Sequence, residues 1–305
     1  MEYENRDCPC CDESSANSRV VKASSPRAED LNFPELKEYW RGFRKENVFF
    51  SYAKCCNCKL LYCPVYFTEE QLNQLYSSMD DNTAGEEIQA LNETQLNYVE
   101  LASRMAGLNG SILELGGDIG LLTKNLLTRP EISSVTVIEP NREVHSSLKN
   151  VIADRGRVVE SWQELSTNSK YHAVVAVHVL DHLPNLKSDL EKIHEVLADE
   201  GRVFFVTHNE RSILRFILSK KWPPFCLQHP QLYRESTIES ALLAVGFKRI
   251  EHKKTSNAFT VSHVIEVLGN LFGLRLKLNK SRINLRLNIR LGNIATVAHK
   301  LEAKG

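Results

Sequence analysis

Residues 111–120 read Ser-Ile-Leu-Glu-Leu-Gly-Gly-Asp-Ile-Gly, and they set the fold class. An apolar segment runs into a turn with three glycines, and a helical pattern follows over residues 121–127. Glycine lets the backbone turn sharply between a strand and a helix, and a ligand can approach because no Cβ is in the way. Since one glycine-rich loop is a weak signal, the surrounding pattern has to support it.

The surrounding pattern is an alternation of short apolar strands with helices. This alternation predicts an α/β domain, namely a Rossmann-like, mostly parallel sheet with helices on both faces. The expected strands are residues 111–115, 135–139, 157–159, 172–177, 202–207, 247–252 and 293–298. The expected helices are residues 121–127, 142–154, 186–197 and 261–272, and one that opens at a capping box at residues 236–239.

The second expected strand ends in an acid, Glu139, followed by Pro140. In nucleotide-binding sheets, an acid at this place accepts hydrogen bonds from ribose hydroxyls. The plain alternative is a charge that stabilises the N-terminus of the next helix. The glycine loop and this acid together favour ribose binding.

At these residues the chain resembles the class I S-adenosylmethionine-dependent methyltransferases. Their motif is hydrophobic-(Asp/Glu)-x-Gly-x-Gly-x-Gly, and Glu114, Gly116 and Gly120 match it. Asp118 replaces the middle glycine, and Gly117 stands where cysteine or alanine is common. The acid at position 118 can instead accept a hydrogen bond from the ammonium group of the cofactor.

Three later segments extend the resemblance over residues 86–300. Residues 171–184 resemble the fourth-strand motif, with Val-Leu-Asp-His where the family usually has Val-Leu-Glu-His. Residues 193–207 resemble the fifth-strand motif, and residues 291–300 resemble the closing strand. Four motifs in the right order are more specific than any one of them.

The resemblance implies S-adenosylmethionine as cofactor and a role for each matched residue. Glu114 and Gly116 would lie along its methionine part, with the loop residues beside them. Glu139 would hold the ribose, and Ser161 and Trp162 would pack the adenine.

Methyl transfer to a protonated acceptor needs a base, and histidine suits that role near neutral pH. His229 is the first candidate, with His208 and His178 behind it. His178 follows the fourth strand and should face the reactive end of the cofactor. Asp181 and His182 are expected to be structural, holding the turn into the next helix.

Seven of the eight cysteines precede residue 64. The N-terminus has no signal-peptide pattern, so a cytoplasmic location is expected, where clustered cysteines favour a metal over disulfides. Two Cys-x-x-Cys pairs predict a closed structural zinc site of four thiolates. The predicted ligands are Cys8, Cys11, Cys55 and Cys58. Other ligand choices are Cys10, Cys56 and Cys63, and reduced thiols without a metal are the alternative.

We therefore expect three segments. Residues 1–66 form the cysteine-rich zinc-binding unit, residues 67–110 a helical connector that opens at a capping box at Thr68, and residues 111–305 the S-adenosylmethionine-binding domain. The basic stretch at residues 274–290 is expected to be an exposed strand or a solvated loop.

The N-terminal arrangement is similar to that of the sugar C-methyltransferases of deoxysugar pathways and their relatives in glycan clusters. His229 matches the last histidine of their Tyr-His-Glu-His-type stretch, whereas Gln228 and Cys226 replace its acid and its tyrosine. These replacements argue against C-methylation specifically. The resemblance implies a small polar acceptor, such as a nucleotide-linked sugar, a glycan unit or a natural-product intermediate.

Two other functions stay open at this point. A nicotinamide-dependent enzyme uses a similar sheet, but it usually carries Gly-x-Gly-x-x-Gly. A non-catalytic, zinc-containing scaffold protein is favoured by the altered glycine loop and by Gln228 and Cys226. The 38 basic and 38 acidic side chains balance, so we expect no nucleic-acid partner. No apolar run reaches the roughly 18 residues of a membrane span, and the oligomeric state stays open.

Overall fold

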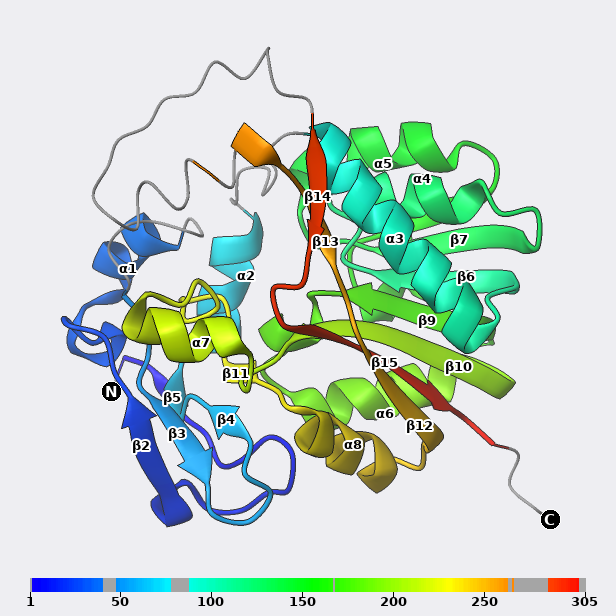
Figure 1. Ribbon diagram of the computed structural model, residues 1–305. Helices are drawn as coiled ribbons and strands as arrows, with labels where there is room; N and C mark the ends of the chain where they lie inside the picture. The colour runs from blue at the N-terminus through cyan, green and yellow to red at the C-terminus, as the bar shows by residue number, and fades with distance from the viewer. Residues whose placement is uncertain are drawn as a thin grey trace.

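The computed structural model describes residues 2–40, 48–77, 88–166, 168–262, 265 and 285–301. Its centre is a seven-stranded sheet in the order β12-β15-β10-β9-β6-β7-β8 (Figure 1). The strands are β6 (Gly110–Leu115), β7 (Ile132–Ile138), β8 (Gly156–Val159), β9 (Tyr171–Val177), β10 (Leu197–His208), β12 (Lys248–Lys254) and β15 (Asn293–His299). Only β15 runs antiparallel to its neighbours in this sheet, so the expected mostly parallel α/β fold is confirmed.

Helices cover both faces of the sheet (Figure 1). One face carries α3 (Ile88–Ala106), α4 (Leu121–Leu127) and α5 (His145–Ile152), whose apolar residues form one buried core. The other face carries α6 (Leu186–Val196) and α8 (Glu235–Ala244), which form a second core.

Successive side chains of the central strands belong alternately to these two cores. In β10, Phe204 belongs to the first core and Phe205 to the second, and both are fully buried. Side chains alternate between the faces of a strand, so a strand covered on both faces is apolar along its length. This explains why these segments read as continuous apolar runs rather than as alternating ones.

The two capping boxes have different outcomes. At α2 (Glu69–Ser77), the Gln71 amide donates to the Thr68 hydroxyl at 3.3 Å, and the Thr68 amide donates to the Gln71 side chain at 2.9 Å. The box predicted at residues 236–239 is wrong, because α8 already begins at Glu235. There the Thr237 hydroxyl accepts from the Arg234 amide at 3.0 Å, which moves the start of the helix upstream.

Two late segments are described only in part. Residues 261, 262 and 265 are helical, and the rest of the helix expected at residues 261–272 lies outside the described residues. Of the basic stretch, residues 285–290 are described. They include β14 (Arg286–Ile289), which pairs antiparallel with β13 (Asn257–Thr260) beside α3 (Figure 1).

The N-terminal unit is a small sheet in the order β11-β4-β3-β2. Its strands are β2 (Ser18–Lys22), β3 (Tyr52–Cys55), β4 (Leu61–Tyr62) and β11 (Gln231–Leu232), with the pair β1 (Glu4–Asn5) and β5 (Val65–Tyr66) beside it. Strand β11 comes from far along the chain, more than 160 residues after β4. The aromatic core of the unit also includes Trp222 and Phe225, together with residues of α1 (Phe33–Tyr39).

A buried ion pair links this unit to the rest of the chain. The side chain of Glu210 is 1% exposed and accepts from Lys54 of β3 at 3.2 Å. It also accepts from Arg215 of α7 (Ile213–Leu218) at 2.5 Å. Two cations compensate for the burial of the carboxylate, which would otherwise be costly. The N-terminal unit is therefore joined to residues 210–232 by both apolar and charged contacts.

Candidate active site and cysteine cluster

The glycine loop lies at the carboxyl end of β6, beside the loop that follows β9. Gly116 has a φ of +72°, and a Cβ at this position would lie 2.6 Å from Cγ2 of Val179. Gly120 has a φ of +87° and begins the turn into α4. Only glycine adopts these angles without strain, and the close approach of Val179 excludes a side chain at Gly116.

Glu139 joins the glycine loop to the next loop of the sheet. Its Oε2 accepts from the amide of Asp118 at 3.0 Å, and its Oε1 accepts from the amide of Asn141 at 2.9 Å. The side chain is buried. A carboxylate has about four acceptor sites, so these two bonds leave capacity for ribose hydroxyls.

Glu114 is the other acid of the loop, and it is fully buried. Its Oε2 accepts from the Thr123 hydroxyl at 2.7 Å, whereas its Oε1 is buried without a partner among the described residues. Burial, with a smaller contribution from the charge of Glu139, raises the pKa of Glu114 to about 8. A buried, incompletely paired carboxyl group is typical of a site that a ligand completes.

The remaining cofactor candidates line the same edge of the sheet. Asp118 adopts a φ of +46°, the left-handed region that its family counterpart, a glycine, takes easily. Ser161 and Trp162 begin a short 3-10 helix after β8, and Trp162 packs against the core. Glu160 is paired with Arg142 at 2.7 Å on the surface.

The three candidate bases come together at the carboxyl ends of β9 and β10. The ring centres of His178 and His208 are 4.4 Å apart, and those of His208 and His229 are 4.9 Å apart. His182 joins them, with its ring centre 4.7 Å from that of His229. Nδ1 of His208 lies 3.0 Å from Oδ2 of the fully buried Asp181. We call these five residues the histidine cluster.

Sequence reasoning placed Asp181 and His182 outside the chemistry, yet both lie within the cluster. The signal was present, since they stand three and four residues after His178 at the end of a buried strand. Tyr76 of α2 also reaches the cluster, with its hydroxyl 3.2 Å from Nδ1 of His182.

Burial lowers the pKa of three imidazoles of the cluster, those of His178, His182 and His229. Burial and the neighbouring rings of His182 and His208 hold the pKa of His229 well below its usual range. Burial also lowers the pKa of His182, to about 4. The pKa of Asp181 is lowered by His208 and His178, despite its burial. An ionised carboxylate therefore lies among rings of which these three favour the neutral form.

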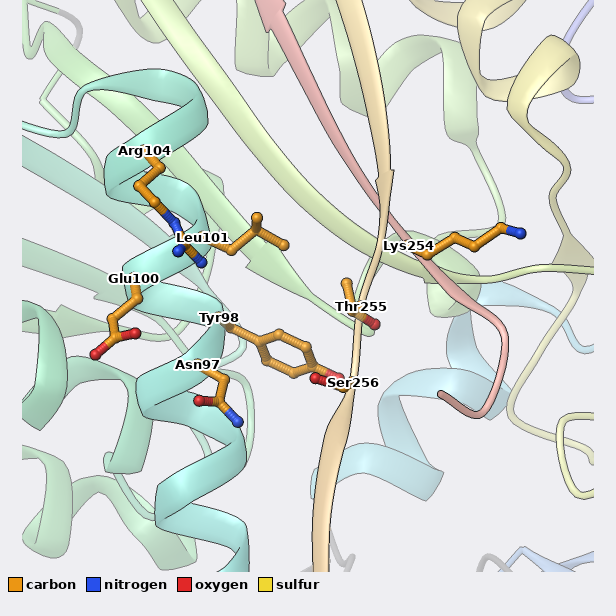
Figure 2. A pocket seen from close by; sticks show the side chains of 8 residues that line it. All are labelled: Asn97, Tyr98, Glu100, Leu101, Arg104, Lys254, Thr255 and Ser256. Atoms are coloured by element: carbon orange, nitrogen blue, oxygen red, sulfur yellow. The ribbon is translucent and has the colours of Figure 1, made fainter. Parts of the chain in front are cut away.

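A cavity of about 130 Å³ opens between α3 and the end of β12 (Figure 2). Its lining is mostly polar and includes Asn97, Glu100, Arg104 and Lys254. Tyr98 also lines it, and the ring centre of this tyrosine is 6.2 Å from that of His178. None of the residues predicted for the site lines this cavity, but Tyr98 connects it to the histidine cluster.

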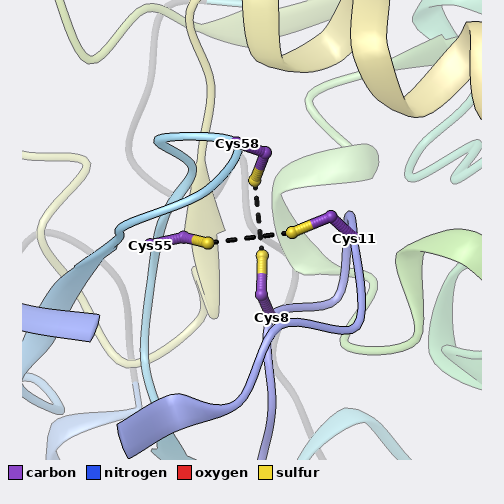
Figure 3. A group of neighbouring side chains, drawn as sticks. All are labelled: Cys8, Cys11, Cys55 and Cys58. Atoms are coloured by element: carbon purple, nitrogen blue, oxygen red, sulfur yellow. Dashed lines mark hydrogen bonds between the residues drawn. The ribbon is translucent and has the colours of Figure 1, made fainter. Parts of the chain in front are cut away.

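The four predicted metal ligands of the N-terminal unit meet at one point (Figure 3). The Sγ atoms of Cys8 and Cys58 are 3.4 Å apart, and those of Cys11 and Cys55 are 3.7 Å apart. Four thiolates around a zinc ion at about 2.3 Å lie ~3.8 Å from one another, so the donor set and the spacing fit zinc.

Of the other thiols, Cys10 lies beside Cys58 at the edge of the four-cysteine cluster, while Cys56 and Cys63 have other surroundings. Cys10 points toward the carbonyl oxygen of Thr237 at 3.8 Å, Cys63 toward that of Phe50 at 3.6 Å, and Cys56 is exposed. The residues after the two Cys-x-x-Cys pairs, Asp12 and Lys59, have φ of +57° and +67°. They take the left-handed conformation that glycine usually supplies in such knuckles.

Comparison with known proteins identifies the family. The family described as "Methyltransferase domain" (Methyltransf_23) matches residues 89–252. The chain belongs to this family. It is an S-adenosylmethionine-dependent methyltransferase, which is favoured over a nicotinamide-dependent enzyme or a scaffold protein. No curated protein sequence matches the chain.

Solved structures share the fold of this methyltransferase at low sequence identity. A complex of the Haloferax volcanii Trm112 methyltransferase activator with a methyltransferase gives a TM-score of 0.52 at 11% identity, covering 71% of this chain and 94% of that one. N-methyltransferase NodS from Bradyrhizobium japonicum WM9, in complex with S-adenosyl-L-homocysteine, gives 0.48 at 12% identity, covering 76% and 98%. No helix in the described part of the methyltransferase is long and apolar enough to cross a membrane.

Proposed function

We propose that this methyltransferase transfers the methyl group of S-adenosylmethionine to a small polar acceptor, with His229 as the base. The observation that carries the proposal is the close approach of the glycine loop, at Gly116, to Val179, the residue that follows His178 of the histidine cluster. A donor held over the glycine loop would therefore present its reactive end to the cluster.

The residues of the loop fit the methyl donor. Gly116 lets the loop turn tightly against Val179 at a φ of +72°, and the unpaired Oε1 of Glu114 can bond to the methionine end. Glu139, whose carboxylate already anchors two loops, would hold the ribose hydroxyls. Ser161 and Trp162 would border the adenine.

The bound donor supplies a methyl carbon attached to a sulfonium sulfur. The sulfur would leave as a neutral thioether, with the electron pair of the broken carbon–sulfur bond. The chain has to place the acceptor in line with that bond and take its proton. Nδ1 of His229 lies 2.8 Å from the carbonyl oxygen of Pro224, so Nδ1–H donates to it. The lone pair is then on Nε2, which receives the proton as the acceptor attacks.

The proposed acceptor class is a nucleotide-linked sugar, a glycan unit or a natural-product intermediate. It rests on the similarity of the N-terminal unit to that of the sugar C-methyltransferases. Cys226 replaces the tyrosine of those enzymes, and its Sγ lies 3.3 Å from Nδ1 of His229. A thiol does not supply the phenolic hydroxyl of that tyrosine.

The N-terminal unit is proposed to be fastened by a structural zinc ion. The ion would hold the thiolates of Cys8, Cys11, Cys55 and Cys58 together, leaving no position open for catalysis. A reducing compartment such as the cytoplasm would keep these thiols free to bind it. We propose residues 1–66 as this unit, residues 67–110 as the connector and residues 111–305 as the catalytic domain.

The function is tested by turnover. Purified protein is incubated with S-adenosylmethionine and a panel of nucleotide-linked sugars, and S-adenosylhomocysteine is quantified by mass spectrometry. The matched controls are the same nucleotides without their sugars. We expect product that depends on the sugar, with a mass increase of one methyl group on it. Equal turnover with the bare nucleotides would contradict the acceptor class.

A further inference from the structure

Three side chains of the histidine cluster have the arrangement of a metal site. His178, Asp181 and His208 each offer one ligand atom, and these atoms all lie within 4.8 Å of one another. Nδ1 of His208 is 3.0 Å from Oδ2 of Asp181, and Nδ1 of His178 is 4.0 Å from the same oxygen. Ligand atoms on one divalent ion are about 3–3.5 Å apart, because each bond is about 2.1 Å long. His208 is thus at ligand spacing from Asp181, and binding of an ion would require Nδ1 of His178 to move closer by about 0.5–1 Å.

Two atoms of this group are buried and lack a hydrogen-bond partner among the described residues. They are Oδ1 of Asp181 and Nδ1 of His178. Asp181 is fully buried, so its unpaired oxygen carries a desolvation penalty that a bound cation would offset. A cation bound by Asp181 and His178 would compensate for the burial of these polar atoms.

Neighbouring groups hold the proposed ligands in place. The side-chain amide of Asn293 lies 3.4 Å from Nε2 of His178, and the amide N–H of His208 donates to Oδ2 of Asp181 at 3.2 Å. Histidines that bind a metal usually have the second ring nitrogen hydrogen-bonded in this way, which fixes the ring.

We infer that His178, Asp181 and His208 bind a divalent transition-metal ion, and that this ion holds a hydroxyl oxygen of the acceptor. Two imidazoles and one carboxylate suit Fe²⁺, Co²⁺, Ni²⁺ or Zn²⁺ and leave coordination positions open. Coordination makes a hydroxyl more acidic, so its proton passes more readily to His229, whose ring is 4.9 Å from that of His208. The role toward the acceptor rests on the proposed function, whereas the binding of the ion does not.

The inference is tested with Co²⁺ as the probe, on full-length protein that already carries one zinc ion per chain. Co²⁺ is titrated by calorimetry and by visible absorption. We expect one Co²⁺ per chain, with the weak bands of nitrogen and oxygen ligands and no thiolate-to-cobalt charge-transfer band. The absence of that band separates this site from the four cysteines.

Variants show where the cobalt binds. His178→Gln and His208→Gln should each weaken Co²⁺ binding by roughly 100-fold. His252→Gln, which lies outside the cluster, should bind like the unchanged protein. The zinc content and the melting temperature report whether each variant has folded. If one of the two site variants does not fold, the other still tests the site.

Failure to bind Co²⁺, or binding that neither site variant weakens, would overturn the metal site and leave a hydrogen-bonded His–Asp pair. S-adenosylhomocysteine binding is measured on the same samples. If S-adenosylhomocysteine binds and Co²⁺ does not, the metal site fails while the proposed function stands. If Co²⁺ binds and S-adenosylhomocysteine does not, the metal site stands while the proposed function fails.

Discussion

Nδ1 of His229 lies 2.8 Å from the carbonyl oxygen of Pro224, and this contact decides which nitrogen of the ring can act as a base. The carbonyl can only accept, so Nδ1 carries the hydrogen and Nε2 carries the lone pair. The tautomer is thereby fixed by the backbone five residues upstream rather than by an acidic partner.

The first prediction concerns this base. His229→Gln should lower kcat by about 10²–10⁴-fold and leave the affinity for S-adenosylhomocysteine unchanged, because the donor does not need the base. Steady-state kinetics with the best acceptor of the panel and calorimetry measure the two effects. His252→Gln is the matched control and should behave like the unchanged protein. A kcat unaffected by His229→Gln would remove His229 from this role.

The second prediction concerns the glycine loop. In Gly116→Ala, the new Cβ would lie 2.6 Å from Val179 at a φ of +72°, so the loop or the Val179 side chain must shift and the loop is strained. We expect affinity for S-adenosylhomocysteine to fall by about tenfold or more, since about 1.4 kcal/mol corresponds to one factor of ten. Gly246→Ala is the control, because Gly246 also has a positive φ, +98°, but lies beside His194. Similar losses of affinity in both variants would contradict a specific role of the loop.

The third prediction follows from the raised pKa of Glu114. The folded protein keeps this carboxyl protonated up to about pH 8, whereas the unfolded chain ionises near its ordinary pKa of 4.5. The unfolded state therefore binds fewer protons in this window, and the free energy of unfolding falls as the pH rises from about 4.5 to 8. The side chain of Gln at position 114 cannot ionise. The free energy of unfolding of Glu114→Gln, relative to that of the unchanged protein, should therefore increase with pH.

Urea unfolding at pH 5 and pH 8 measures this difference. The gain in stability of Glu114→Gln between the two pH values should be on the order of several kcal/mol. Glu143→Gln, at an exposed position nearby, serves as the control and should show no such change. Parallel pH profiles for the unchanged protein and Glu114→Gln would contradict the raised pKa.

Much of the sheet could be predicted from the sequence, because buried parallel strands are apolar along their whole length. All seven expected strands of the central sheet occur, and the helix at Leu121–Leu127 has the expected bounds. The Cys-x-x-Cys pairs likewise predicted which four sulfurs meet, since each pair is a local turn.

Contacts between distant segments could not be predicted in this way. β11 joins the N-terminal sheet from residue 231, and it carries no local pattern that distinguishes it from a loop. The spacing after His178 could have placed Asp181 and His182 near that residue, but their contacts with His208 and His229 depend on segments far along the chain. The left-handed backbone of Asp12 and Lys59 also escapes residue-type reasoning, because the turn imposes it on side chains that rarely adopt it.

The fourth prediction concerns the four-cysteine cluster. Purified protein should contain one zinc ion per chain, and Cys58→Ser should lose it and melt roughly 5–10 °C lower. Cys56→Ser is the control, since Cys56 is exposed and lies outside the cluster. Elemental analysis and thermal unfolding measure both effects. A protein that folds fully without zinc would count against the site.

The central claim is that this chain holds S-adenosylmethionine over the loop between β6 and α4. The most direct measurement is calorimetric titration with S-adenosylhomocysteine, comparing the unchanged protein with Glu139→Ala and with Glu143→Ala, which changes an exposed acid nearby. We predict micromolar binding that Glu139→Ala abolishes and Glu143→Ala preserves. A folded, zinc-loaded protein that does not bind S-adenosylhomocysteine, or that binds it equally well in Glu139→Ala, would contradict the account.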